Sequence, residues 1–185
     1  MKRRLFLSIA IPRRINDAIG REVEKIRYGF TDEVRFIDDA ERHITISFLG
    51  SQADEAMADI SGAMAVARTF PAPTVSFDMI TYGPRRGEPR MIWLNGDLET
   101  DKTLHELKEE VENRLIDGGI SFQREYKRFQ THVTLAKMKT HEALPELSVP
   151  FRHSFVPESL DLMESHMSRT GATYELLQKM PFQVS

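Results

Sequence analysis

Two kinds of hydrophobic pattern occur along the chain, and together they predict a mixture of strands and helices. Apolar and polar residues in strict alternation are typical of a strand with one buried face, whereas apolar residues three or four positions apart are typical of an amphipathic helix. We therefore expect strands over residues 5–11, 34–37, 43–50, 75–82, 90–98 and 120–126. We expect helices over residues 13–28, 52–68 and 101–117. Two or three more strands follow residue 150, with Arg169, Thr170 and Gly171 as a hairpin turn.

The order strand, helix, strand, histidine-containing strand occurs twice along the chain. The first copy runs from Leu5 to Leu49, and the second runs from Met91 to Met138. Each copy ends on a strand that begins with a histidine. If the two modules pack about a pseudo-twofold axis, the corresponding faces of the two histidine strands meet in one cleft.

The two histidine strands share a motif, His-x-Thr-x, with apolar residues at both x positions. It reads "HITI" from His43 and "HVTL" from His132. Because alternate residues of a strand share a face, each histidine lies beside the threonine two positions on, Thr45 or Thr134. In the first strand the alternation extends further and predicts a polar face and a buried face: His43, Thr45 and Ser47 on the one, and Ile44, Ile46 and Phe48 on the other. With six histidines in 185 residues, roughly 0.4 His-x-Thr matches are expected by chance. Two matches in the same place of a repeated order favour a functional site over two structural histidines.

Composition narrows the possible classes of protein. The 185 residues include no cysteine, which excludes disulfides, a thiolate nucleophile and a cysteine metal site, and which suits a reducing cytoplasm. The formal net charge of -3 disfavours a non-specific duplex-DNA binder, so any contact with nucleic acid is expected to be local. The basic start and apolar run at the N-terminus alternate like a strand, so we expect no secretion signal. No segment approaches the roughly 18 apolar residues of a membrane span.

The chemistry of the two motifs suits a phosphate diester. Two facing imidazoles supply one acid and one base near neutral pH, and threonine hydroxyls on the same face can donate hydrogen bonds to the non-bridging oxygens. No metal or other cofactor is required by this set, and the other histidines show no tight ligand spacing with carboxylates. The chain also lacks a glycine-rich phosphate loop, which disfavours nucleoside-triphosphate or dinucleotide chemistry.

At these motifs the sequence resembles the two-histidine phosphoesterases, and among them the bacterial and archaeal RNA 2′,3′-cyclic phosphodiesterases, also called 2′-5′ RNA ligases. The resemblance rests on the paired motifs, on "HITISFLG" and on the strand "RMIWLNGDL", and it covers the whole chain. It implies an α+β fold with two lobes, built from two pseudo-symmetric β-α-β-β modules whose antiparallel sheets form a central cleft. It implies that residues 1–185 form a single two-lobed domain. It also implies opening of a 2′,3′-cyclic phosphate to a 2′-phosphomonoester, with His43 as proton donor, His132 as proton acceptor, and Thr45 and Thr134 as phosphate-binding residues.

The segment before the second motif departs from the family pattern. Many family members have R-P-F-x-P-H there, whereas this chain has "KRFQTH". Phe129 matches, Lys127 stands at the arginine position, and Thr131 replaces the proline. We expect substrate contacts from Phe129 and from Lys127 or the neighbouring Arg128.

Several other residues have two readings. Arg85, Arg86 and Arg90 either bind RNA phosphates or form a solvated hairpin tip. Trp93 is expected to pack in the core rather than to stack a base, and Glu164-Ser165 either lines the cleft or lies at a sheet edge.

The expected partners are RNA ends or nucleoside 2′,3′-cyclic phosphates, and the protein is expected to be a cytoplasmic monomer without a membrane contact. The alternative function is a non-catalytic module that binds an RNA end or a nucleotide in the same cleft. Two complete motifs favour the enzyme, because binding alone needs no acid–base pair.

Overall fold

The computed structural model describes residues 2–30, 34–84, 87–125, 129–138, 144–168 and 171–183. The α-helices are α1 (Arg13–Arg27), α2 (Met57–Met64) and α3 (Leu98–Asp117). The 3-10 helices are η1 (Asp39–Glu41), η2 (Asp54–Ala56) and η3 (Ala65–Arg68). The strands are β1 (Lys2–Ala10), β2 (Val34–Phe36), β3 (His43–Ala53), β4 (Val75–Gly83), β5 (Met91–Gly96), β6 (His132–Met138), β7 (Ser148–Pro150), β8 (Ser154–Phe155), β9 (Ser159–Ser168) and β10 (Gly171–Pro181).

The strands form a mixed α+β fold around antiparallel pairs in the order β10-β9-β1-β3-β6-β5-β4-β7, with β2 on β6 and β8 on β4. The two histidine strands, β3 and β6, are neighbours in the middle of this order. We call β10, β9, β1 and β3 the first half-sheet, and β6, β5, β4 and β7 the second. On each side the motif strand is followed by the strand that opens its own module, β1 or β5. This order is consistent with the pseudo-symmetry that the repeated element order predicts.

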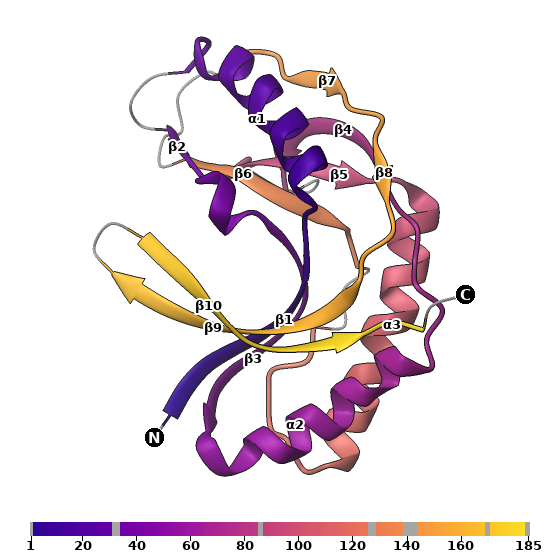
Figure 1. Ribbon diagram of the computed structural model, residues 1–185. Helices are drawn as coiled ribbons and strands as arrows, with labels where there is room; N and C mark the ends of the chain where they lie inside the picture. The colour runs from indigo at the N-terminus through magenta and orange to yellow at the C-terminus, as the bar shows by residue number, and fades with distance from the viewer. Residues whose placement is uncertain are drawn as a thin grey trace.

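Each long helix covers the half-sheet to which the strand before it does not belong. Figure 1 shows α1, which follows β1, lying over the second half-sheet, whereas α3, which follows β5, lies with α2 against the first. Buried apolar side chains at helical spacing account for both positions: Ile15, Ile19 and Val23 on α1, and Leu104, Leu107, Val111 and Leu115 on α3. At the start of α3 the Asp97 carboxylate accepts a hydrogen bond from the Thr100 amide at 2.8 Å, which satisfies one free N–H of the first turn.

A β-bulge in β3 turns one predicted polar residue into the core. Ser8 pairs with Thr45 and Leu7 pairs with Ser47, so that two residues, Ile46 and Ser47, lie where a regular strand has one. The prediction that Ser47 shares the polar face with His43 is therefore wrong, since Ser47 is buried and its hydroxyl donates to Glu112 of α3 at 2.7 Å. Phe48, predicted to be buried, is instead 61% exposed.

Three predicted boundaries also differ from the structure. Residues 120–125 form no strand, so the second module consists of β5, α3 and β6 over the described residues. Gly50 does not end its strand, since the pairing of β3 with β1 continues to Ala53. Its φ of +69° is a conformation that glycine adopts without steric cost. The helix expected over residues 52–68 is divided into η2, α2 and η3. The β9–β10 hairpin is present as expected, but its predicted turn residues Arg169 and Thr170 lie outside the described residues.

Within the described ranges, no helix combines the length and the apolar character that crossing a membrane requires. The assignment of residues 1–185 to a single domain stays a prediction.

Candidate active site

The register between β3 and β6 brings the two motifs together. Ile44 of β3 pairs with Val133 of β6, and both side chains are fully buried. In an antiparallel pair the flanking residues point to the opposite face of the sheet, so His43 lies across from Thr134, and Thr45 lies across from His132. All four motif side chains therefore share one face, as the repeated motif predicts.

The two imidazoles are oriented in the same way. Nδ1 of His43 lies 2.8 Å from the carbonyl oxygen of Glu41, and Nδ1 of His132 lies 2.7 Å from the carbonyl oxygen of Gln130. A carbonyl oxygen only accepts, so in each ring Nδ1–H is the donor. This contact fixes the tautomer of each ring, with the proton on Nδ1.

The surroundings of the two rings differ. His43 packs against Phe6 and the edge of Tyr174, with centroid distances of 5.0 and 4.9 Å. Burial lowers the pKa of His43 below its ordinary value, the hydrogen bond to Glu41 opposes this, and the nearby charges of His132 and Lys137 lower the pKa further. Free His43 therefore favours the neutral form.

His132 instead lies flat on the indole of Trp93, with centroids 3.9 Å apart and planes inclined by 21°. Trp93 is buried, and its ring occupies the space that a side chain at Gly83 would need. Trp93 thus has the core position predicted for it, and it also supports the second motif histidine.

The two threonine hydroxyls are available to a ligand. Thr45 and Thr134 are half-buried and pair across the sheet with Ser8 and Trp93. Neither hydroxyl forms a hydrogen bond with another described residue. Two donors on the same face as two imidazoles can bind the non-bridging oxygens of a phosphate.

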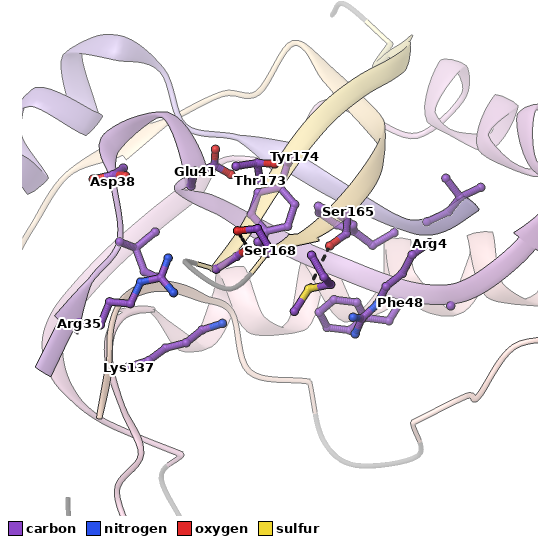
Figure 2. A pocket seen from close by; sticks show the side chains of 17 residues that line it. Arg4, Arg35, Asp38, Glu41, Phe48, Lys137, Ser165, Ser168, Thr173 and Tyr174 are labelled. Carbon is purple, nitrogen blue, oxygen red and sulfur yellow. Dashed lines mark hydrogen bonds between the residues drawn. The ribbon is translucent and has the colours of Figure 1, made fainter. Parts of the chain in front are cut away.

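A pocket of about 540 Å³ lies beside His43, between β1, β3, β9 and β10 on one side and β2 and β6 on the other. Figure 2 shows its charged and aromatic side chains. Phe6, Tyr174 and Glu41, which surround His43, also line this pocket. It therefore continues the motif face into the space between the half-sheets.

The remaining sequence candidates are placed in different ways. Phe129 is half-buried and packs against the core, and it is absent from the pocket lining. Lys127, Arg128, Arg85 and Arg86 lie outside the described residues, whereas Arg90 is exposed. Ser165 lines the pocket, while the Glu164 carboxylate points elsewhere and accepts from Arg3 at 2.6 Å.

Most of the pocket lining is not predicted by the sequence pattern. The described residues that it did not single out include Arg4, Phe6, Arg35, Glu41, Phe48, Lys137 and Tyr174. For Phe48 the missing information was the bulge, which reverses the faces of β3 beyond Thr45. For the others the missing information was the contact between distant strands.

One cluster of ligand atoms lies outside this site. Side chains of Glu164, His166 and Glu175, on β9 and β10, place ligand atoms within 4.8 Å of one another. The spacing of residues along the chain does not reveal this cluster, because Glu175 comes from the neighbouring strand. Each of these groups already has a partner, since Glu164 pairs with Arg3 at 2.6 Å and His166 contacts Glu175 at 3.2 Å.

Solved structures of other proteins share this fold. The protein TT0787 of Thermus thermophilus has a TM-score of 0.81 and 23% identity, over 97% of this chain and 98% of that chain. E. coli LigT complexed with 3′-AMP has a TM-score of 0.79 and 23% identity, over 98% and 99% of the two chains. At such identities the likeness establishes the α+β fold.

The family follows from the sequence itself. The model of the 2′-5′ RNA ligase superfamily matches residues 15–169, and the chain belongs to this family. A protein of Thermotoga maritima named RNA 2′,3′-cyclic phosphodiesterase is 24% identical over 187 residues, which cover 97% of this chain and 96% of that protein. A Bacillus subtilis protein of the same name is 28% identical over 156 residues, covering 82% of this chain and 81% of that protein.

Proposed function

We propose that the protein is a metal-independent phosphodiesterase that opens RNA or nucleotide 2′,3′-cyclic phosphates to 2′-phosphomonoesters. The single observation that carries this proposal is the Ile44–Val133 register, which supports two imidazoles and two hydroxyls on one face. The family and the shared name of its relatives add the substrate class.

In the proposed reaction the two histidines act on opposite sides of the phosphorus. Nε2 of His132 removes a proton from a water molecule, whose oxygen attacks phosphorus. The bond from phosphorus to O3′ breaks, and Nε2–H of His43 donates its proton to that leaving oxygen. Thr45 and Thr134 donate hydrogen bonds to the non-bridging oxygens, where negative charge increases in the transition state.

The lowered pKa of His43 has a consequence for the donor role. The free enzyme holds His43 mainly neutral at pH 7, whereas the reaction needs it protonated. A bound phosphate diester brings a negative charge to the site, which stabilises the imidazolium form of His43. We therefore expect substrate binding and protonation of His43 to be coupled.

The assignment of donor and acceptor comes from the family resemblance. Both rings donate from Nδ1 to a backbone carbonyl in the same way, so these contacts alone allow either direction. The stack on Trp93 supports His132 as acceptor, because an aromatic face stabilises the imidazolium that forms when the base takes its proton.

Ligation is the same chemistry with a different nucleophile. If a 5′-hydroxyl of an RNA replaces water, attack on the cyclic phosphate joins two strands through a 2′-5′ linkage. A binding module is the second candidate, and it is disfavoured because both acid–base residues and both hydroxyls are present. The cytoplasmic location and the monomeric state stay predictions.

A turnover experiment tests the proposal directly. The protein is incubated with adenosine 2′,3′-cyclic phosphate, and the product isomer is identified by chromatography. We expect adenosine 2′-phosphate from the wild-type protein and at most trace product from a folded His132→Ala variant. Binding of the nucleotide without turnover would favour the binding module.

A further inference from the structure

Phe48 is an aromatic side chain that the β3 bulge leaves exposed in the pocket beside His43. Its side chain is 61% exposed and lines the 540 Å³ pocket. Isolated exposed apolar residues are common, but this one continues a row of rings. The buried Phe6 contacts His43 at a centroid distance of 5.0 Å and Phe48 at 6.0 Å, so the row leads from the motif histidine to an open aromatic surface.

A cationic side chain accompanies this surface. Arg4 is exposed on β1, two residues before Phe6, and lines the same pocket. Its guanidinium has no ion pair or hydrogen bond with any other described residue. Figure 2 shows Arg4 at the same end of the pocket as Phe48, whereas the acidic lining residues Asp38 and Glu41 lie towards the other end. This end of the pocket therefore combines an aromatic surface with an uncompensated positive charge.

Such a combination is typical of sites that hold single-stranded nucleic acid. Bases stack on aromatic side chains irrespective of their identity, while cations follow the phosphate backbone. The pocket volume is also within the range of about 300–1,000 Å³ that is usual for small-ligand sites.

We propose that Phe48 and Arg4 form a second nucleotide subsite, which takes the penultimate nucleotide of an RNA whose terminal nucleotide carries the cyclic phosphate. This inference rests on the proposed function. The terminal ribose lies between the motif strands, and the penultimate base stacks on the exposed face of Phe48. Arg4 binds the phosphodiester that joins the two nucleotides. The enzyme then prefers an oligonucleotide end over a free cyclic nucleotide, with little selection among bases.

The test compares three substrates with one another at each of several salt concentrations: adenosine 2′,3′-cyclic phosphate, the dinucleotide ApA with a terminal 2′,3′-cyclic phosphate, and the same dinucleotide without its penultimate base. Phe48→Ala should lower kcat/KM for ApA on the order of 10-fold, and it should leave the mononucleotide and the abasic dinucleotide unchanged. Phe48→Trp should retain the wild-type preference. Arg4→Ala should weaken both dinucleotides equally and reduce their salt dependence.

Two variants serve as matched controls. Leu98→Ala removes an apolar side chain that is 69% exposed at the start of α3, and Arg152→Ala removes an exposed arginine, both outside the pocket lining. Neither should change the preference for ApA. Equal activity of wild type and Phe48→Ala on ApA, or an equal loss on all three substrates, would overturn the subsite.

A binding measurement separates this inference from the proposed function. A dinucleotide with 2-aminopurine at the penultimate position and a 3′-phosphate at its end reports binding by its fluorescence, without turnover. Its fluorescence should change on binding to the wild-type protein, and this change should be lost with Phe48→Ala. If the signal depends on Phe48 but no cyclic phosphate is opened, the subsite stands and the proposed activity fails. If cyclic phosphates are opened but the signal does not depend on Phe48, the subsite is wrong.

Discussion

The imidazole of His132 is stacked on the indole of Trp93, with ring centroids 3.9 Å apart. The corresponding ring of the other motif, His43, packs against Phe6 and the edge of Tyr174 instead. Two modules with the same motif thus provide different environments for their histidines. This difference gives a physical basis for one histidine to act as base and the other as acid.

Substitution of Trp93 should therefore affect turnover through His132. Trp93→Leu should lower kcat by about 3- to 10-fold, because it removes the aromatic face that stabilises the imidazolium. Trp93→Phe should retain most of the rate. Thermal unfolding must be recorded for both variants, since a buried side chain is replaced, and kcat is compared well below the lower Tm. Equal kcat for the Leu and Phe variants would contradict this role.

The effects of replacing the two histidines should not be additive. His43→Ala and His132→Ala should each lower kcat by roughly 10²–10⁴-fold, the usual range for a general acid or base. The double variant should be only slightly slower than the slower single variant, because loss of either group disables the same step. Thr45→Ala and Thr134→Ala should have smaller effects. A folded His43→Ala protein with near-normal turnover would exclude the mechanism.

The pH profile of kcat/KM should be bell-shaped. Its alkaline limb should lie at a lower pH than an ordinary histidine would give. In the free enzyme the proposed proton donor, His43, must be protonated, and its pKa is lowered chiefly by burial. Activity should therefore fall, as pH rises, around a pKa below the ordinary value of about 6.5 for histidine. On the acid side it falls as the proposed general base becomes protonated. The profile is measured at low substrate concentration, and His43→Ala should lose the alkaline limb.

Activity should survive removal of metal ions. The motif set supplies acid, base and anion donors, so excess chelator should leave kcat unchanged. The same experiment examines the cluster of Glu164, His166 and Glu175, whose ligand atoms lie within 4.8 Å of one another. Loss of activity on chelation, with recovery on addition of a divalent ion, would contradict the proposed chemistry. Glu175→Gln then serves as the variant that connects such a loss to the cluster.

A buried charge cluster between β3 and α3 should contribute strongly to stability. Glu112 accepts from Ser47 and pairs with Lys108 at 2.6 Å and Arg124 at 3.1 Å. Glu112→Gln removes the carboxylate that pairs with the buried Lys108, whereas Arg124 keeps Glu109 at 2.7 Å, and the free energy of unfolding should fall by about 3–5 kcal/mol. Glu110→Gln, in an exposed pair with Arg114, is the control and should cost at most about 0.5 kcal/mol. Urea unfolding measures both, and equal effects would contradict the argument.

The sequence predicts the parts of this protein that depend on local periodicity and on repetition. The strands around His43 and His132, the helix that buries Leu104 and Leu107, and the shared face of the motifs all follow from it. It does not predict the bulge at Ile46–Ser47, because the hydrophobic alternation continues through Phe48 as if the strand were regular. Nor does it predict Tyr174 beside His43, since that contact depends on the β9–β10 hairpin pairing with the distant strand β1.

The direction of attack is the last prediction. A 2′,3′-cyclic phosphate has two candidate leaving oxygens, and which one leaves depends on the histidine beside it. The family resemblance puts the donor His43 next to O3′, so the product should be a 2′-phosphate with a free 3′-hydroxyl. In a 3′-thio analogue the leaving sulfur needs no proton, which makes the acid dispensable. On this analogue His43→Ala should recover most of the wild-type rate, while His132→Ala should remain as impaired as on the normal substrate. Mainly 3′-phosphate product, or equal losses from the two variants on the analogue, would mean that the donor and acceptor are reversed or shared.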